Sequence, residues 1–343
     1  MLKDSKKIYI EVMRIVAIFM VLYVHSGIRA AQHYEIAGSG MSYYLSVTLR
    51  CLTQSCNMIF FMISGALLLK KEESIQYVFT HRVLKTVAII MIFDLLQYYA
   101  NYRENPAIGF SADVYFKLAY SSDVIVQYWY LHAYLAFLLM LPLLRLIVKN
   151  IKREHYWYLG GLYVFLEGIL PVIERLWENG RIAVELPVFE ANILCPLFGY
   201  YLVNIYDLEE SRNVRMRKLA AMNVLGIAAL LISVREAIIL LKNHQELIVY
   251  EGFLFIMAAV LFLDVRYIFT RFSVPKIVGK IIVFIGGGVL GVYLLEPQLR
   301  EGFAFIYDAI EPSTNWLIAT FIWLSACVLA GSLLGRLLRI FRI

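Results

Sequence analysis

The feature that most constrains this chain is a series of long apolar segments along its whole length. A helix that crosses a bilayer needs about 20 predominantly apolar residues. Ten segments of roughly this length can be marked out in the 343 residues, near 8–28, 43–69, 83–101, 125–148, 156–174, 187–206, 218–241, 247–268, 280–296 and 315–338. We therefore expect an all-α polytopic membrane protein, a bundle of about ten transmembrane helices in a lipid bilayer.

The composition agrees with this expectation. Hydrophobic residues make up 61% of the chain and charged residues 17%, whereas soluble domains carry about 25% charged residues. The connectors are too short to hold a separate soluble domain. We expect residues 1–343 to form one integral membrane domain, with any active site inside the bundle or at its rims.

The basic residues predict the orientation of the chain. Cytoplasmic loops of membrane proteins carry an excess of Lys and Arg. With the N-terminus inside, 22 basic residues fall on the cytoplasmic side and 7 on the outer side. This difference predicts ten spans with both termini cytoplasmic in a multi-pass protein of the cell membrane. It also explains the net charge of +6 without a nucleic-acid partner.

The first segment has an alternative interpretation as a cleaved signal peptide. Its basic start and apolar run are followed by Ala30 and Ala31, which is typical of such peptides. Glu11 and Arg14, however, place charges inside the apolar run. We therefore expect a retained first helix.

The cysteines show no spacing typical of a metal site. Their positions suggest apolar packing, and neither a bound metal nor a disulfide framework is expected. The four are Cys51, Cys56, Cys195 and Cys327.

The first segment also carries three ionisable residues that share one face of the predicted helix. Glu11 lies three residues before Arg14, and neighbours at this spacing share a face. His25 follows Arg14 by eleven residues, which is three turns plus about 20°. Glu11 and Arg14 could form an ion pair that stabilises packing near the inner interface, and His25 alone could be a packing residue. Ionisable groups inside membranes are nevertheless functional candidates, and histidine is a common general base.

These residues carry a resemblance to a known family. The segment Ile10–Ala17, continued to His25 and Ser26, resembles the opening helix of the membrane-bound acyltransferase-3 family. The family signature is a basic residue, ten intervening residues and a histidine, with an acidic residue three positions before the basic one. Glu11, Arg14 and His25 fit it.

Further segments resemble the same family, most strongly over residues 8–145. They are Asn57–Gly65, with paired phenylalanines before Ser-Gly, Phe79–Lys85, and Trp129–Leu131 followed by Leu141–Leu144. Gly291–Pro297 resembles a late segment in which many members have histidine before the proline. This chain has Glu296 there, so no role is carried over to that position.

The resemblance implies an acyltransferase that moves an acyl group, most often acetyl, from cytoplasmic acyl-CoA to a hydroxyl. The acceptor would be a surface glycan, a lipid-linked sugar or a small metabolite. His25 would act as the catalytic base, by direct transfer or through an acyl-enzyme. Arg14 would steer or neutralise the donor, and Glu11 would hold its guanidinium in place.

The donor site should be basic, because coenzyme A carries several phosphates. Arg82 and Lys85 match the family and lie three apart, although both also satisfy the positive-inside rule. Asn57 and Ser64 lie two turns apart and could donate hydrogen bonds to a thioester oxygen. Both could instead be polar residues that allow close helix packing.

Two other functions fit ten spans with charges inside the bilayer. The first is a transporter or flippase for a lipid-linked sugar or a small metabolite. The run Gly286–Gly288 could break a helix at its binding site. The second is a sensor or scaffold in which the charged face of the first helix serves packing alone.

Overall fold

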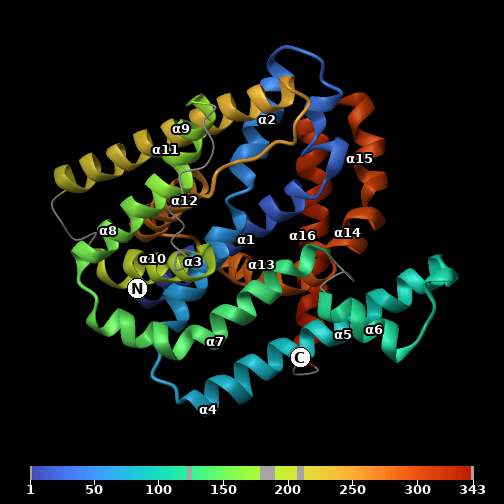
Figure 1. Ribbon diagram of the computed structural model, residues 1–343, viewed down its shortest axis with the longest axis horizontal. Helices are drawn as coiled ribbons and strands as arrows, with labels where there is room; N and C mark the ends of the chain where they lie inside the picture. Colours follow the sequence, from blue (N-terminus) through green and yellow to red (C-terminus); the bar gives the residue numbers. More distant parts are fainter. Residues whose placement is uncertain (1, 122–125, 178–189, 207–211, 341–343) are drawn as a thin grey trace. The chain divides into compact units, whose positions relative to one another are not determined.

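The computed structural model describes residues 2–121, 126–177, 190–206 and 212–340, and all regular secondary structure in these residues is helical (Figure 1). The longer elements are α1 (Leu2–Val24), α2 (Met41–Thr53), α3 (Cys56–Leu68), α5 (Leu84–Glu104), α7 (Trp129–Asn150), α8 (Arg153–Val164), α11 (Arg212–Lys242), α12 (Glu251–Arg271), α13 (Lys276–Leu294) and α16 (Trp316–Ile340). The shorter ones are α4 (Ile75–Val78), α6 (Ala112–Ser121), α9 (Leu170–Trp177), α10 (Ala191–Tyr200), α14 (Glu296–Gly302) and α15 (Ala304–Ile310).

Eight helical segments of the described chain are long and apolar enough to cross a membrane. They coincide with eight of the ten predicted spans, so the all-α, multi-pass membrane architecture is confirmed. The other two predicted spans correspond to α1 and to the shorter apolar helix Ala191–Ile205. The count of ten and the cytoplasmic termini stay predictions.

Local backbone irregularities interrupt several spans. A turn at Gln54–Ser55 separates α2 from α3. Wider π-helical turns follow α4, α8 and α10, at Phe79–Val83, Phe165–Ile169 and Tyr201–Ile205. Each π turn adds a residue to the helical repeat and so rotates the side chains that follow it.

The described residues form two compact units, which divide the chain within α3. The first comprises residues 1–66 and 152–342, and the second residues 67–151. The expectation of one domain over the whole length stays a prediction.

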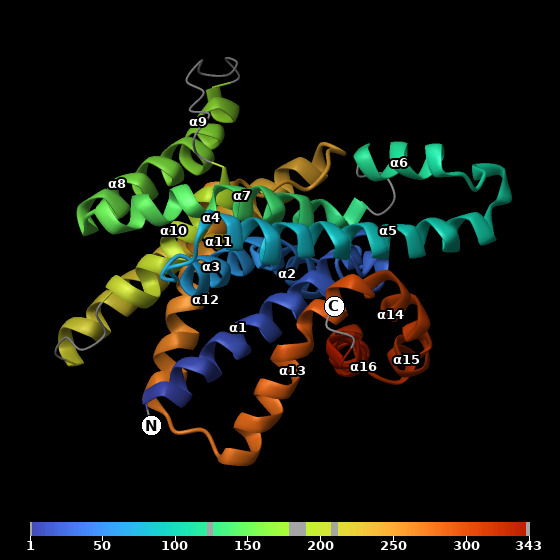
Figure 2. The same ribbon diagram turned by 90° about the horizontal axis from the view of Figure 1, so that it is seen from below.

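The first unit is built around α1, which lies between α12 and α13 and also contacts α16 (Figure 2). The side of α1 that faces these helices carries apolar side chains, and Met13, Ala17 and Ile18 are fully buried. Tyr9 meets Phe262 of α12 edge to face, with ring centroids 6.4 Å apart. The helix that carries the predicted catalytic residues is therefore at the core of its unit.

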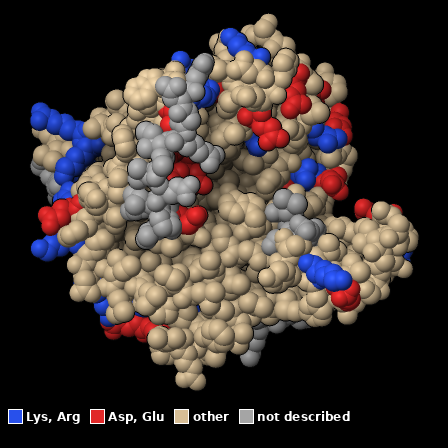
Figure 3. Space-filling view, viewed as in Figure 1, with Lys and Arg blue, Asp and Glu red and all other residues tan. Residues whose placement is uncertain are grey.

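Apolar side chains also cover much of the surface, where lipid replaces water. On α11, Leu225, Ile227 and Leu231 are more than half exposed. Lys and Arg gather in small groups over a mostly uncharged face (Figure 3). An exposed apolar helix face of this kind is expected for a membrane span.

The second unit consists of α4, α5, α6 and α7, and α5 packs against both α6 and α7 (Figure 2). Tyr98 of α5 joins the connector to α6, because its hydroxyl donates to the Gly109 carbonyl at 2.7 Å. Tyr115 of α6 donates to the Met91 carbonyl at 2.8 Å. These bonds fix α6 along α5 as a helical hairpin.

Candidate active site

Glu11 and Arg14 form the ion pair that their spacing predicts. The Arg14 Nη1 donates to both carboxylate oxygens of Glu11, at 2.9 and 3.0 Å. One nitrogen serves both oxygens, so the pair lacks the two-nitrogen fork of a bidentate contact. The Glu11 side chain is 10% exposed and Arg14 28%. The carboxylate is therefore enclosed, while the guanidinium keeps access to a ligand.

The glycine run of α13 makes room for this pair. A Cβ at Gly286 would lie 2.6 Å from Glu11 Oε2 and 2.8 Å from Glu11 Cβ. Helix α13 continues through Gly286–Gly288 without a break, from Lys276 to Leu294. The expected interruption of the ninth span is therefore wrong. The glycines bring helices together because they lack side chains, as small residues do in membrane bundles.

His25 is the first residue beyond α1, in a turn that several hydrogen bonds hold in place. The Ser26 hydroxyl donates to the Tyr23 carbonyl at 2.6 Å and accepts from the Ala31 amide at 2.9 Å. Gly27 has φ of +59°, a left-handed conformation that suits glycine at a helix end. The His25 backbone is therefore fixed on both sides.

Arg50 of α2 donates a hydrogen bond to a backbone carbonyl at the end of α1, next to His25. Its Nη1 donates to the Val24 carbonyl at 2.7 Å. The last carbonyls of a helix have no intrahelical partners, and a cation there also balances the helix dipole. Arg50 thereby ties α2 to the residue that precedes the catalytic candidate.

The most informative contact of the site joins His25 to Glu296 at the start of α14. The Nδ1 of His25 lies 3.6 Å from Glu296 Oε2. This separation is within ion-pair range but longer than a hydrogen bond. Both atoms are buried without a hydrogen-bond partner in the described part of the chain. Glu296 is 1% exposed and the His25 side chain 25%, so only the imidazole is accessible.

Glu296 is held from its other side by Arg300, one turn later on α14. The Arg300 Nε donates to Glu296 Oε1 at 2.8 Å. The Arg300 carbonyl in turn accepts the indole N–H of Trp323 on α16, at 3.2 Å. A charged group buried to this degree is costly unless it is paired. Arg300 therefore holds one carboxylate oxygen of Glu296, while the other oxygen faces His25.

This arrangement is suited to proton transfer by the imidazole. If Nδ1 of His25 and Oε2 of Glu296 approach from 3.6 Å to hydrogen-bond distance, Nδ1 donates to the carboxylate and Nε2 is left as the acceptor. The same carboxylate stabilises the imidazolium that forms when Nε2 takes a proton. His25 and Glu296 can thus act together as a general base.

Asn57 and Ser64 lie on α3, on one face as their spacing predicts. Both are half-buried. The Ser64 hydroxyl donates to the Phe60 carbonyl at 2.9 Å, within its own helix. A role as donor to a thioester would require this bond to be exchanged. The next residue, Gly65, is in close backbone contact with Pro196 of α10, so the Ser-Gly pair serves at least a close helix crossing.

Arg82 and Lys85 belong to the second unit, where Arg82 is already paired. Its guanidinium binds both oxygens of Glu73, with Nε 2.8 Å from Oε2. The buried Arg145 donates to the same carboxylate at 2.8 Å. The bonds from Arg82, and secondarily from Arg145, lower the pKa of Glu73 to about 2. Lys85 is exposed and keeps its charge available.

A metal centre has no obvious place in the described residues. Groups of three His, Cys, Asp or Glu that could hold an ion are absent there. The four cysteines are free and buried.

The sequence did not assign Glu296, Arg300 or Arg50. The spacing of Glu296 and Arg300, four residues apart, was a possible signal, since it predicts an ion pair on one helix face. Their approach to His25 depends on the fold and could not be read from spacing.

Comparison with known proteins gave a match to one family model. A family model described as an acyltransferase domain, that of the acyltransferase-3 family, matches residues 7–335. Neither the curated proteins nor the solved structures gave a match. The family model covers α1, α14 and almost all of the chain between its ends. The chain therefore belongs to the acyltransferase-3 family and is a multi-pass membrane acyltransferase.

Proposed function

We propose that this acyltransferase moves an acyl group, most simply acetyl, from cytoplasmic acyl-CoA to a hydroxyl of a glycan, a lipid-linked sugar or a small metabolite. The observation that carries the proposal is the accessible imidazole of His25 beside the buried carboxylate of Glu296. This pair provides a base for a hydroxyl nucleophile, which is the group that acyl transfer to an alcohol has to activate.

The proposed reaction begins with the acceptor hydroxyl hydrogen-bonded to Nε2 of His25. The hydroxyl proton passes to Nε2 as its oxygen attacks the thioester carbonyl. The C–S bond then breaks, and the coenzyme A sulfur leaves with the proton from the imidazolium. The carboxylate of Glu296 stabilises the positive ring. An acyl-imidazole intermediate would use the same residues.

The donor would be held by positive charge. Arg14 is 28% exposed and is oriented by Glu11, so its remaining N–H groups can bind a phosphate of the donor. Arg82 and Lys85, in the second unit, stay proposed phosphate contacts on their resemblance to the family alone. Because Arg82 is paired with Glu73, while Lys85 forms no ion pair among the described residues, Lys85 should contribute more to phosphate binding.

The transporter hypothesis loses one supporting feature. The run Gly286–Gly288 could have marked a broken helix at its binding site, whereas α13 is continuous there and packs closely on α1. We therefore propose the transferase alone.

The test is thioester turnover by the purified protein in lipid, followed as free thiol released from acetyl-CoA. We expect His25→Ala to lower the rate about 10²- to 10⁴-fold, the usual contribution of a general base. The matched control is His244→Asn, which removes an exposed imidazole where φ is +55°, a conformation that asparagine tolerates.

The outcomes separate the possibilities. The transferase is supported if thiol release is lost in His25→Ala but not in His244→Asn, and if both variants have the melting temperature of the wild type. Wild-type release that survives His25→Ala would remove His25 from the chemistry. Absence of acetyl-CoA binding and turnover in folded wild type would overturn the acyl-CoA proposal.

A further inference from the structure

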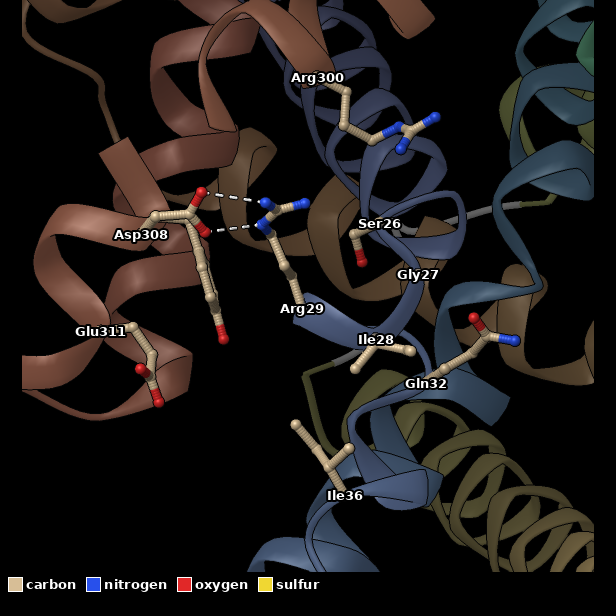
Figure 4. A pocket seen from close by; sticks show the side chains of 10 residues that line it. Ser26, Gly27, Ile28, Arg29, Gln32, Ile36, Arg300, Asp308 and Glu311 are labelled. Atoms are coloured by element: carbon tan, nitrogen blue, oxygen red, sulfur yellow. Dashed lines mark hydrogen bonds and ion pairs between the residues drawn. The ribbon is translucent and has the colours of Figure 1, made fainter. Parts of the chain in front are cut away.

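A polar cavity opens directly beyond the end of α1. Its volume is about 660 Å³, and its lining begins at Ser26, the residue after His25. The remaining lining comes from the turn that follows α1 and from α14, α15 and the short turn after α15 (Figure 4). All these segments belong to the first unit. The cavity therefore lies next to the proposed base in the sequence and in the fold.

Charged and polar side chains lie among apolar ones such as Ile28 and Ile36 in the lining. Two arginines and two acidic residues contribute to it, namely Arg29, Arg300, Asp308 and Glu311. Gln32 and Tyr307 add further polar groups. The charges of the four ionisable residues cancel. Such a cavity offers many hydrogen bonds but little net attraction for an ion.

Arg29 and Asp308 face each other across the cavity rim and join segments 279 residues apart (Figure 4). Arg29 Nε and Nη2 donate to the two carboxylate oxygens at 2.9 and 3.0 Å. The hydrogen bond from Arg29 lowers the pKa of Asp308, so this carboxylate stays ionised. Both side chains are about half exposed, and an exposed pair contributes little to stability.

The geometry of this pair suits a hydroxyl-bearing ligand. Arg29 Nη1 is not used by Asp308, and each carboxylate oxygen has a second lone pair. The pair thus presents a donor and acceptors in fixed positions. Two neighbouring hydroxyl groups can match such an arrangement, because each is both a donor and an acceptor.

Glu311 adds an acceptor that no neighbour neutralises. Its carboxylate forms no ion pair or hydrogen bond within the described residues. Arg29 is committed to Asp308 and Arg300 to Glu296. Among the described residues, the carboxylate of Glu311 is therefore the charge of the lining that has no counter-ion. It would accept hydrogen bonds from hydroxyls and repel an anionic ligand.

Arg300 connects the cavity to the reaction centre. It lines the cavity and also binds Glu296, which faces His25. A ligand held against Arg300 is thus one side chain away from the carboxylate of the His25–Glu296 pair. Ser26 also lines the cavity, but its hydroxyl is already used in the turn after α1.

We propose that this cavity is the acceptor site and that Arg29, Asp308 and Glu311 select an uncharged, polyhydroxylated acceptor over an anionic one. The inference rests on the proposed transferase function and adds the acceptor class and the residues that determine it.

The test uses uncharged methyl pyranosides and the corresponding methyl uronosides, which differ by one carboxylate. Acetyl transfer from acetyl-CoA is measured by mass with each, and free thiol is followed in parallel. We expect the uncharged sugars to be acetylated at least about tenfold more efficiently. Glu311→Gln and Asp308→Asn should each raise the KM for the sugar about tenfold or more, since a hydrogen bond to a charged group contributes about 1.5–3 kcal/mol. The KM for acetyl-CoA should change less than about twofold.

Two further variants sharpen the test. Glu311→Lys should reverse the preference toward the uronosides, because it replaces the unpaired negative charge by a positive one. Glu301→Gln removes an exposed carboxylate of α14 that does not line the cavity, and it should leave the preference unchanged. All the substituted side chains are at least partly exposed, so folding should be retained, which melting curves can verify.

The results also distinguish this inference from the proposed function. Thiol release without transfer to any uncharged sugar, or a preference that the Glu311 variants leave unchanged, would overturn the acceptor assignment alone. Absence of thiol release in the wild type would overturn the transferase proposal as well.

Discussion

At the scale of single residues, the site depends on a carboxylate with two partners. Glu296 accepts a hydrogen bond from Arg300 on one oxygen and faces His25 with the other. If the charge of Glu296 were removed, the ring would lose the group that orients it. Arg300 would then have no counter-ion at this position. Glu296 is therefore a positioning residue in the proposed mechanism.

This role predicts the behaviour of Glu296→Gln. Loss of a group that orients a functional histidine commonly costs about 10- to 100-fold in activity, and we expect a loss of this size in kcat. Thiol release from acetyl-CoA at one fixed pH measures this loss.

A purely structural role of Glu296 would give a different result. The kcat would then fall together with the melting temperature. Glu296→Asp is the matched variant, because it keeps the charge and should retain more of the kcat than Glu296→Gln.

The sequence predicted some of these residues and not others for a clear reason. Glu11 and Arg14 are neighbours on one helix, so regular geometry alone places them together. His25 came from the family signature. The contact between His25 and Glu296, by contrast, joins distant parts of the chain, and local patterns carry no information about it.

At the scale of helices, the most extensive contact between two helices joins α13 to α16, and it is made through small residues. Gly288 meets the backbone at Ser332, and Gly291 meets Gly335. Van der Waals packing of this kind is a main source of helix association in membranes, where the hydrophobic effect between helices is weak. Because α14 and α16 hold Glu296 in place, this packing also supports the site.

The packing predicts a large effect from one added methyl group. A Cβ at Gly291 would lie 2.6 Å from the Gly335 backbone nitrogen, and backbone atoms cannot move as a side-chain end can. We expect Gly291→Ala to lower the free energy of unfolding by about 1–3 kcal/mol, the usual cost of overpacking. Thermal melting in one fixed detergent would measure it.

Gly161→Ala is the matched control for this prediction. Gly161 also lies within a helix, but a Cβ there meets nothing within 4 Å. Alanine forms helices better than glycine by about 1 kcal/mol, so this variant should melt at the wild-type temperature or higher. Equal melting temperatures of Gly291→Ala and Gly161→Ala would contradict the proposed role of the α13–α16 contact.

The sequence predicted the existence of most helices but not their local form. Hydropathy is summed over a long window, so it finds the span near 43–69 and misses the turn at Gln54–Ser55. It likewise misses the π turns, which leave the apolar count unchanged. The run Gly286–Gly288 suggested a possible break in the helix, because glycine is a poor helix former in water. Close packing against neighbouring helices outweighs that preference here.

At the scale of the whole molecule, the charge distribution predicts a specific topology. A reporter that is active only outside the cytoplasm should be inactive when fused after Arg342 and active when fused after Asn243, in the connector between α11 and α12. The reason is the excess of basic residues on alternate connectors, 22 against 7. Activity of the fusion after Arg342 would contradict cytoplasmic termini.

The ion pair between Arg29 and Asp308 has a consequence for biosynthesis. Its members are separated by 279 residues, and at about 5–20 residues per second their synthesis is separated by roughly 15–55 s. During this interval the nascent chain already carries His25 but has neither Glu296 nor the far wall of the cavity. A product that stops before α14 therefore contains the imidazole without the groups that orient it, so the active site can be completed only after α14 and α15 have been synthesised.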